Sequence, residues 1–253
     1  MKVYGDYHTH THYSDGVAKV EQNVAVAIEK GLQELAITDH AFGNPSTWSL
    51  TREKFASQLV EINAMREKFG DKLTIYTGIE ADIVGTDGEL DIRQDEVHQF
   101  DVLVMGYHSF AKPKDWQSFK DIFLSAHLRM IKFPSKEDIA RNTKSIIESI
   151  KRYPIDILAH PNHLFKVDCY ELAKAASDYG VYMELNAKHI NTLSHEAFEK
   201  MLTTDVKFLI NSDAHKAERI ANFEKPLAYA KKHNMDLSRI VNLHSTPTFK
   251  KKS

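Results

Sequence analysis

The stretch VYGDYHTH, residues 3–10, is a predicted β-strand that ends in two histidines, His8 and His10. Side chains alternate between the two faces of a strand, so residues i and i+2 point the same way. The two imidazoles can therefore face a single ion, and His is the commonest metal ligand in proteins. This ending predicts a chelating strand, and similar endings recur along the chain.

Short aliphatic or β-branched runs alternate with amphipathic stretches, which is typical of parallel strands joined by crossover helices. Strands are predicted at 3–8, 34–38, 73–79, 102–107, 155–159, 181–185 and 207–210. Helices are predicted at 17–30, 52–69, 136–152, 170–179, 195–202 and 223–233. The pattern favours an α/β fold, either a βα barrel or a closely related open sheet, in one domain spanning residues 1–253.

Several residues mark where these elements begin and end. Ser135 is a plausible helix start, and Gly31, Gly70 and Gly180 lie where helices should stop. Residues 81–92 resemble a hairpin or excursion, and residues 109–135 form a longer insertion.

Composition narrows the classes of partner and compartment. The chain has 33 basic and 35 acidic residues, so it lacks the basic footprint of a nucleic-acid binder. No apolar signal region or membrane span is evident, and a single cysteine, Cys169, is compatible with a reducing compartment. We expect a cytoplasmic protein, and any metal must be held by nitrogen and oxygen ligands.

Potential metal ligands follow nearly every predicted strand. The carboxyl ends of barrel strands converge on one face, where the active sites of such enzymes lie. Besides His8 and His10, the residues at these ends are His40, Glu80, His108, His160, Asp213 and His215. A single histidine is more often an ordinary polar residue, but this series predicts a metal site.

The motifs that carry these residues are HTHTHYSDG (8–16), TDH (38–40), GIE (78–80), GYH (106–108), HP (160–161) and SDAH (212–215). Together they resemble the polymerase and histidinol phosphatase (PHP) superfamily, in the family's motif order over nearly the whole chain. The resemblance implies a distorted seven-stranded (βα)7 barrel, similar to a TIM barrel. It also implies up to three divalent ions, usually zinc, manganese or iron.

The resemblance further implies how the ligands are shared among the ions. One ion would take His8, His10, Glu80 and Asp213; a second would take His108 and His160, with Glu80 bridging to the first; a third would take Asp15, His40 and His215. His12 lies on the same predicted strand face but is no ligand in the family pattern. Glu80, Asp213 and His215 are the residues we expect to act in the reaction itself.

The reaction that this site favours is hydrolysis of a small phosphomonoester by a metal-bound hydroxide, because three divalent ions outweigh the three carboxylates and leave a positive site. Histidinol phosphate, an intermediate of histidine biosynthesis, is one candidate among small phosphorylated metabolites. Two other interpretations stay open: an amidohydrolase-like metal hydrolase, and a metal-stabilised binding or regulatory domain. The oligomeric state stays open as well.

Further residues are expected around the ions. Lys188 and Arg219 are candidates for phosphate contacts, and His163 and His189 for proton donation to the leaving group. Asp6 and Asp39 are candidates for accepting hydrogen bonds from ligand histidines. The loops at 41–51, with Trp48, and 109–118, with Trp116, are expected to govern substrate choice.

Overall fold

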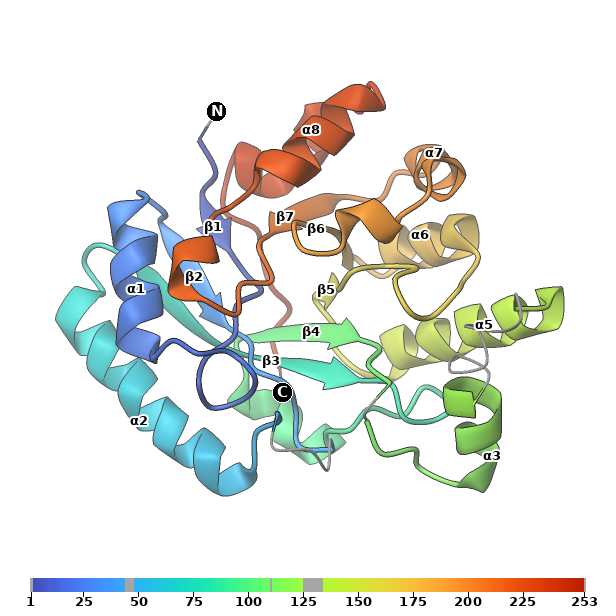
Figure 1. Cartoon of the computed structure of the whole chain (residues 1–253), viewed down its shortest axis with the longest axis horizontal. Coiled ribbons are helices and arrows are strands. Elements are labelled where there is room, and N and C mark those ends of the chain that lie inside the picture. Colours follow the sequence, from blue (N-terminus) through green and yellow to red (C-terminus); the bar gives the residue numbers. More distant parts are fainter. Residues whose placement is uncertain (1, 44–47, 110, 125–133, 253) are drawn as a thin grey trace.

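The computed structural model describes residues 2–43, 48–109, 111–124 and 134–252. Seven parallel strands pair in the order β1-β2-β3-β4-β5-β6-β7 and curl into a nearly closed barrel with helices around it (Figure 1). The strands are β1 (Gly5–Asp6), β2 (Glu34–Ile37), β3 (Thr74–Asp82), β4 (Val102–Gly106), β5 (Ile157–Leu158), β6 (Tyr182–Asn186) and β7 (Phe208–Asn211). The predicted α/β barrel is confirmed, and it is preferred over the open sheet.

The helices lie mainly in the crossovers between successive strands. They are α1 (Val20–Glu29), α2 (Arg52–Phe69), α3 (Trp116–Ser118), α5 (Lys136–Arg152), α6 (Cys169–Asp178), α7 (His195–Leu202) and α8 (Glu224–Lys232). Short helical turns are η1 (Gln94–Gln99), η2 (Phe119–Leu124), η3 (Ile190–Thr192), η4 (Ala217–Arg219), η5 (Leu237–Arg239) and η6 (Val241–Leu243). All six predicted helices are present. Within the described ranges, none of the helices combines the length and the apolar character needed to cross a membrane.

The barrel closes between β1 and β7 without a full ladder. Just beyond the two strands, Thr9 and Ala214 form an isolated parallel bridge. At the other end of the strands the buried Asn242 side chain joins them, because its amide nitrogen donates to Gly5 O at 3.0 Å and to Ile210 O at 2.7 Å. The barrel is therefore closed irregularly at this seam.

The barrel interior changes from apolar to polar along the strand direction. Its amino-terminal half is filled by a cluster of Tyr7, Ala36, Val102, Val104, Ile157, Ala159 and Leu209. By strand alternation Tyr76 and Glu80 of β3 share a face, and Asp213 follows the end of β7. Glu80 and Asp213 therefore place buried charges at the carboxyl end of the barrel. Buried charges need partners, so a charged site is expected there.

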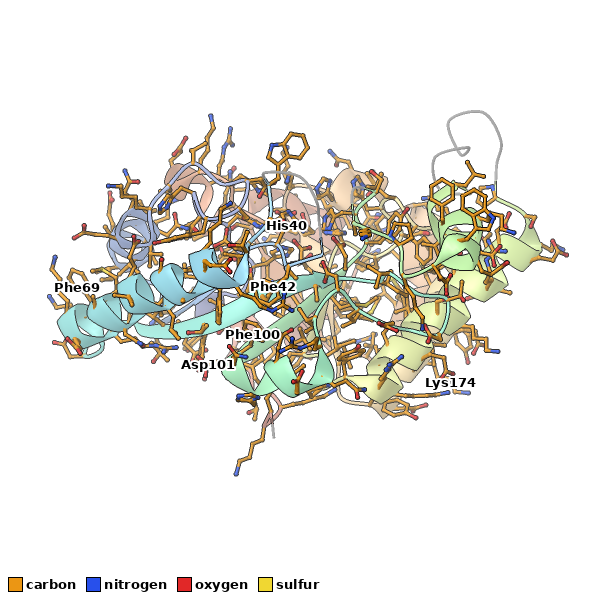
Figure 2. All side chains as sticks on the ribbon, turned by 90° about the horizontal axis from the view of Figure 1, so that it is seen from below. His40, Phe42, Phe69, Phe100, Asp101 and Lys174 are labelled. Carbon is orange, nitrogen blue, oxygen red and sulfur yellow. The ribbon has the colours of Figure 1, made fainter. Side chains whose placement is uncertain are left out.

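The C-terminal segment packs against the amino end of the barrel. The Phe249 ring lies 5.2 Å from the ring of Tyr7, and Lys252 forms an ion pair with Asp156. The Lys252 ammonium also donates to Asp101 O. In Figure 2 Asp101 lies below His40, so this segment lies on the side of the barrel away from the strand-end ligands.

The predicted element boundaries are largely confirmed. The Ser135 side chain accepts from Asp138 N at the start of α5. Gly31 and Gly180, after α1 and α6, adopt φ of 74° and 63°, the left-handed conformation that glycine favours. The predicted hairpin at 81–92 exists, because Ile83 and Leu90 form an antiparallel bridge. The predicted insertion contains α3 and η2, while 110 and 125–133 fall outside the described residues.

Candidate metal centre

The structure brings all nine predicted ligands together at the carboxyl end of the barrel. They come from the ends of β1, β2, β3, β4, β5 and β7, and from the loop before α1. The nine are His8, His10, Asp15, His40, Glu80, His108, His160, Asp213 and His215. His12, by contrast, is exposed and packs beside Tyr13, as expected for a residue outside the site.

The Glu80 carboxylate lies at the centre of the cluster, 1% exposed and surrounded by five imidazoles. The five rings belong to His8, His10, His40, His108 and His160. Its Oε2 lies 3.2 Å from His8 Nε2 and 3.1 Å from His40 Nδ1, whereas its Oε1 lies 3.1 Å from His160 Nε2. The two oxygens thus face different groups of rings, which is the arrangement a bridging carboxylate requires.

A second carboxylate, Asp15, lies at the rim beside three rings, two of which also face Glu80. Its Oδ2 lies 2.9 Å from His215 Nε2 and 3.5 Å from His40 Nε2, and its Oδ1 lies 3.6 Å from His10 Nδ1. One ligand atom from each of these four residues lies within 4.8 Å of the others. This group can hold a divalent ion with nitrogen and oxygen ligands.

The backbone is strained at two of the ligand positions. His160 has a φ of 30° and Asp213 a φ of 52°, the left-handed region that few non-glycine residues adopt. The Asp213 side chain thereby reaches His10, with 3.4 Å between Oδ1 and Nε2. Such strain is typical of functional positions, where the surrounding fold must hold an unfavourable conformation.

Several buried ring nitrogens lack a hydrogen-bond partner. Among the described residues these include His8 Nε2 and both ring nitrogens of His10. A buried polar atom without a partner is costly unless an ion or water satisfies it. The donor set of imidazoles and carboxylates therefore fits divalent metal ions such as zinc, manganese or iron.

The charges of the cluster shift the pKa values of its members. Burial lowers the pKa of His8, but Glu80 and Glu184 outweigh it and raise that pKa well above its ordinary value. Burial and the neighbouring His215 lower the pKa of His10 to about 3. Burial raises the pKa of Glu80, but the imidazoles, His8 first, bring it well below its ordinary value. Glu80 is thus ionised and His10 neutral at pH 7, and a bound ion would displace the proton of His8.

The profile of the family described as "PHP domain" matches residues 6–190, which include seven of the nine clustered residues. The chain belongs to the PHP domain family. The remaining two, Asp213 and His215, follow the matched stretch and complete the cluster of this PHP chain.

Individual relatives match nearly the whole chain. A probable phosphatase of Thermoanaerobacter sp. (strain X514) is 27% identical, over 96% of this chain and 91% of the relative. The DNA polymerase/3'-5' exonuclease of Bacillus subtilis is also 27% identical, but the match covers 40% of that protein. The fold is also similar to that of histidinol phosphate phosphatase from Lactococcus lactis subsp. lactis, whose crystal structure holds zinc, L-histidinol and phosphate. The two structures match with a TM-score of 0.66 and a sequence identity of 18%, over 99% of this chain and 98% of that chain. The last likeness shows a shared fold.

Two buried carboxylates that the sequence interpretation missed orient the rings of this PHP centre. Glu184 Oε1 lies 2.8 Å from His8 Nδ1, and Asp82 Oδ1 lies 2.8 Å from His108 Nδ1. Each leaves the other ring nitrogen facing Glu80. A sequence signal existed, because Glu184 interrupts the apolar run of β6 and Asp82 follows Glu80 by two residues on the same strand face.

The prediction that Asp6 and Asp39 accept hydrogen bonds from ligand histidines is wrong. Both are fully buried, but they accept hydrogen bonds from other groups. Asp6 accepts from the backbone N–H groups of Ser212 and Ala221, each at 3.0 Å. Asp39 accepts from Thr11 N at 2.7 Å. They hold the loops around the ligands rather than the rings, a distinction that proximity in sequence does not reveal.

The four predicted substrate residues all lie at the rim of the PHP centre. Lys188 Nζ lies 3.1 Å from His215 Nε2. His189 Nε2 lies 3.6 Å from Asp213 Oδ2, and the His163 ring lies 3.9 Å from the His189 ring. Arg219 lines a cavity that Asp213 and His215 also line. Their positions are compatible with the expected contacts, and their roles stay predictions.

The two predicted specificity loops are only partly described, because residues 44–47 and 110 lie outside the described ranges. Trp48 and Trp116 are 51% and 70% exposed, and the Trp116 ring stacks on Phe119 at 5.2 Å. Their part in substrate choice therefore stays a prediction.

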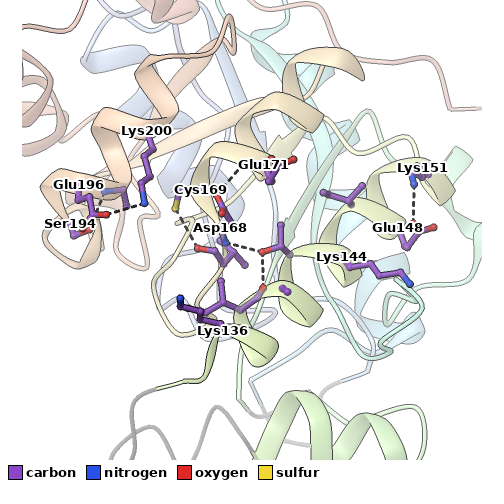
Figure 3. A pocket seen from close by; sticks show the side chains of 16 residues that line it. Lys136, Lys144, Glu148, Lys151, Asp168, Cys169, Glu171, Ser194, Glu196 and Lys200 are labelled. Atoms are coloured by element: carbon purple, nitrogen blue, oxygen red, sulfur yellow. Dashed lines mark hydrogen bonds and ion pairs between the residues drawn. The ribbon is translucent and has the colours of Figure 1, made fainter.

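A second cavity, about 770 Å³ in volume, is larger than the one that Arg219 lines. It lies among the outer helices, between α5, α6 and α7 (Figure 3). Its lining includes none of the nine clustered residues. Two of its lysines are neutralised there, Lys151 by Glu148 and Lys200 by Glu196, each at 2.9 Å. Size alone therefore does not locate the site, and the ligand chemistry of the barrel end does.

Proposed function

We propose that this PHP chain, acting as one domain, is a metal-dependent phosphatase that hydrolyses small phosphomonoesters. The observation that carries the proposal is the buried Glu80 carboxylate, whose two oxygens face separate groups of imidazoles at the carboxyl end of the barrel. Divalent ions bound there would supply an activated water nucleophile at neutral pH and neutralise the phosphoryl oxygens.

The nine clustered residues would hold up to three ions, of zinc, manganese or iron. The proposed sets are His8, His10, Glu80 and Asp213 for one ion, Glu80, His108 and His160 for the second, and Asp15, His40 and His215 for the third. The short distances of Asp15 to His40 and His215 support the third set. Glu80, Asp213 and His215 would lie beside the reacting phosphoryl group.

Positive charge beyond the ions is needed to attract a phosphate dianion. A count of ligand carboxylates alone leaves the site positive, but Glu184 and Asp82 add two buried carboxylates that this count omits. Lys188, whose ammonium lies 3.6 Å from Asp213 Oδ1, restores part of the positive charge at the rim. We propose that it contacts a phosphoryl oxygen.

The leaving group needs a donor on the side opposite the nucleophile. Burial and the nearby His160 lower the pKa of His189 to about 3, so its ring is neutral at pH 7. A neutral imidazole still has one N–H donor. We propose that His189, whose ring lies 3.9 Å from that of His163, donates a hydrogen bond to the leaving oxygen, which then takes its proton from water.

Relatives named as probable phosphatases support the reaction class, and the Lactococcus structure makes histidinol phosphate the first substrate to test. The test measures phosphate release by zinc-, manganese- and iron-loaded protein from a panel of phosphomonoesters that includes histidinol phosphate. Glu80→Gln should lower the rate at least about 100-fold. The exposed Glu67→Gln on α2 is the matched control and should keep the parent rate.

The same panel separates the competing interpretations. Equal rates for Glu80→Gln and the parent would contradict the proposed centre. Fully metal-loaded protein that releases no phosphate from any compound would favour one of the two other interpretations, the amidohydrolase-like hydrolase or the binding or regulatory domain.

A further inference from the structure

A basic cavity of about 340 Å³ adjoins the metal centre. Its inner wall is shared with the centre, because Asp213 and His215 line it. Its outer wall comes from the loop after β6, the turn η4 and the start of α8. The polar residues on this outer wall are Lys188, Lys216, Arg219, Asn222 and Lys225. The volume falls within the range of small-molecule sites, about 300–1,000 Å³.

The cations of this cavity have few counterions. Among the described residues, no carboxylate lies within ion-pair distance of Lys216, Arg219 or Lys225. In another cavity a lining lysine is neutralised, because Lys114 lies there beside Glu89 and pairs with both Asp87 and Glu89. Like charges that line one cavity repel one another, and an anion entering the cavity would relieve that repulsion.

The position of Lys225 is also unfavourable for the fold itself. It lies in the first turn of α8, where the helix dipole favours negative charge. The stability of α8 thus gives no reason for a lysine at this place. A role in binding an anion would explain the lysine at this position.

We propose that this cavity binds an anionic group, a carboxylate or a second phosphate, on the part of the substrate that becomes the leaving alcohol. The proposal rests on the proposed function and narrows it. Lys188 would contact the transferred phosphoryl group beside Asp213 and His215, while Lys216, Arg219 and Lys225 would face the second anion. The substrate class is a phosphomonoester that carries a further negative charge.

This assignment disfavours histidinol phosphate as the natural substrate. The alcohol that it releases carries an ammonium group at neutral pH, which the basic cavity would repel. A phosphorylated hydroxy acid or a bisphosphate would instead place opposite charges together.

Binding of phosphonates tests the cavity without relying on catalysis. Four compounds share one two-carbon spacer: 2-aminoethylphosphonate, propylphosphonate, 3-phosphonopropionate and ethane-1,2-diphosphonate. Their dissociation constants for the zinc-loaded protein would be measured by calorimetry at low ionic strength. The two compounds with a second anion should bind roughly tenfold more tightly than propylphosphonate, and the amine more weakly. Comparison of the dissociation constants of 3-phosphonopropionate and ethane-1,2-diphosphonate shows whether the cavity prefers a carboxylate or a second phosphate.

Charge-reversal variants distinguish two ways in which the second anion could bind, namely to the cations of the cavity or directly to the metal ions. Lys225→Glu should remove most of the preference for the second anion, whereas Lys231→Glu, an equal change of charge farther along α8, should leave it intact. Equal binding of all four compounds, or a preference that survives Lys225→Glu, would overturn the proposal. Because binding and phosphate release are measured separately, the absence of phosphate release would contradict the proposed function alone.

Discussion

His8 Nδ1 lies 2.8 Å from Glu184 Oε1, and both side chains are fully buried. The contact turns Nε2 of the same ring toward Glu80, at 3.2 Å. Glu184 Oε2 also accepts from His160 N at 2.8 Å, so one carboxylate orients ligands from two strands. The metal centre therefore depends on a residue that we do not propose to touch the metal.

Replacing Glu184 should weaken metal binding while the fold persists. Glu184→Gln keeps the shape of the side chain but removes the charge that supports the His8 ring. We expect the affinity for zinc, measured by competition with a chelator, to fall about 10- to 100-fold. Glu171→Gln, on the exposed side of α6, is the control and should bind zinc like the parent. Unchanged affinity in Glu184→Gln would show that His8 needs no such support.

Gly106, at the end of β4, lies directly against the centre. A Cβ at this position would lie 2.9 Å from Glu80 Oε1 and 3.2 Å from His160 Cε1. The atom in the way is the end of a side chain, so Gly106→Ala should fold normally but displace the carboxylate. We expect lower zinc affinity and slower phosphate release, with a metal-free melting temperature close to that of the parent. A large drop in that melting temperature would instead indicate a backbone clash.

Removing the metal should destabilise the protein. Ions that bind the folded state alone add stability, about 2.7 kcal/mol at a free concentration 100 times the dissociation constant. For a chain of this size, chelation should then lower the melting temperature by about 5–10 °C. Scanning calorimetry with a chelator, and again after zinc is restored, checks this. Glu80→Gln should show a smaller difference between the two states than the parent.

Much of the fold and of the metal cluster could be predicted because their signals are local. Each buried strand is a short apolar run, and eight of the nine clustered residues follow such a run at its carboxyl end, as His40 and His160 do. The convergence of strand ends then brings together residues as distant as Asp15 and His215. Pattern and topology together therefore predicted eight of the nine residues, whereas Asp15 was included only because of the family resemblance.

The rest depends on packing between distant segments. The Asp82 and Glu184 carboxylates could be recognised as buried charges but not assigned to particular rings. Asp6 and Asp39 are close to ligands in sequence, yet their carboxylates accept hydrogen bonds from backbone groups of other loops. The docking of Phe249 against Tyr7 joins opposite ends of the chain, and no periodic pattern indicates it.

Cys169 should react slowly in the folded protein. It is 3% exposed at the start of α6, and burial raises the pKa of its thiol to about 11. Since the thiolate is the reactive form, its labelling rate should keep rising with pH between about 8 and 11. In urea the exposed thiol should react at once, with an apparent pKa of about 8.5. Rapid labelling of the folded protein at pH 8 would contradict the burial.

The pairing of Lys252 with Asp156 should stabilise the whole barrel. Their side chains are 3% and 1% exposed, so Lys252→Met would leave a buried carboxylate without its cation, at a cost of about 3 kcal/mol. Burial, the larger effect, already raises the pKa of Asp156 even though Lys252 opposes it. Without the lysine that pKa rises further, so the carboxyl of the variant is protonated, and no longer a buried charge, at low pH. The loss of unfolding free energy relative to the parent should therefore grow as pH increases. Urea unfolding across pH 5–8, with the exposed neighbour Lys251→Met as control, measures this. A deficit that is equal at all pH values would indicate lost packing instead.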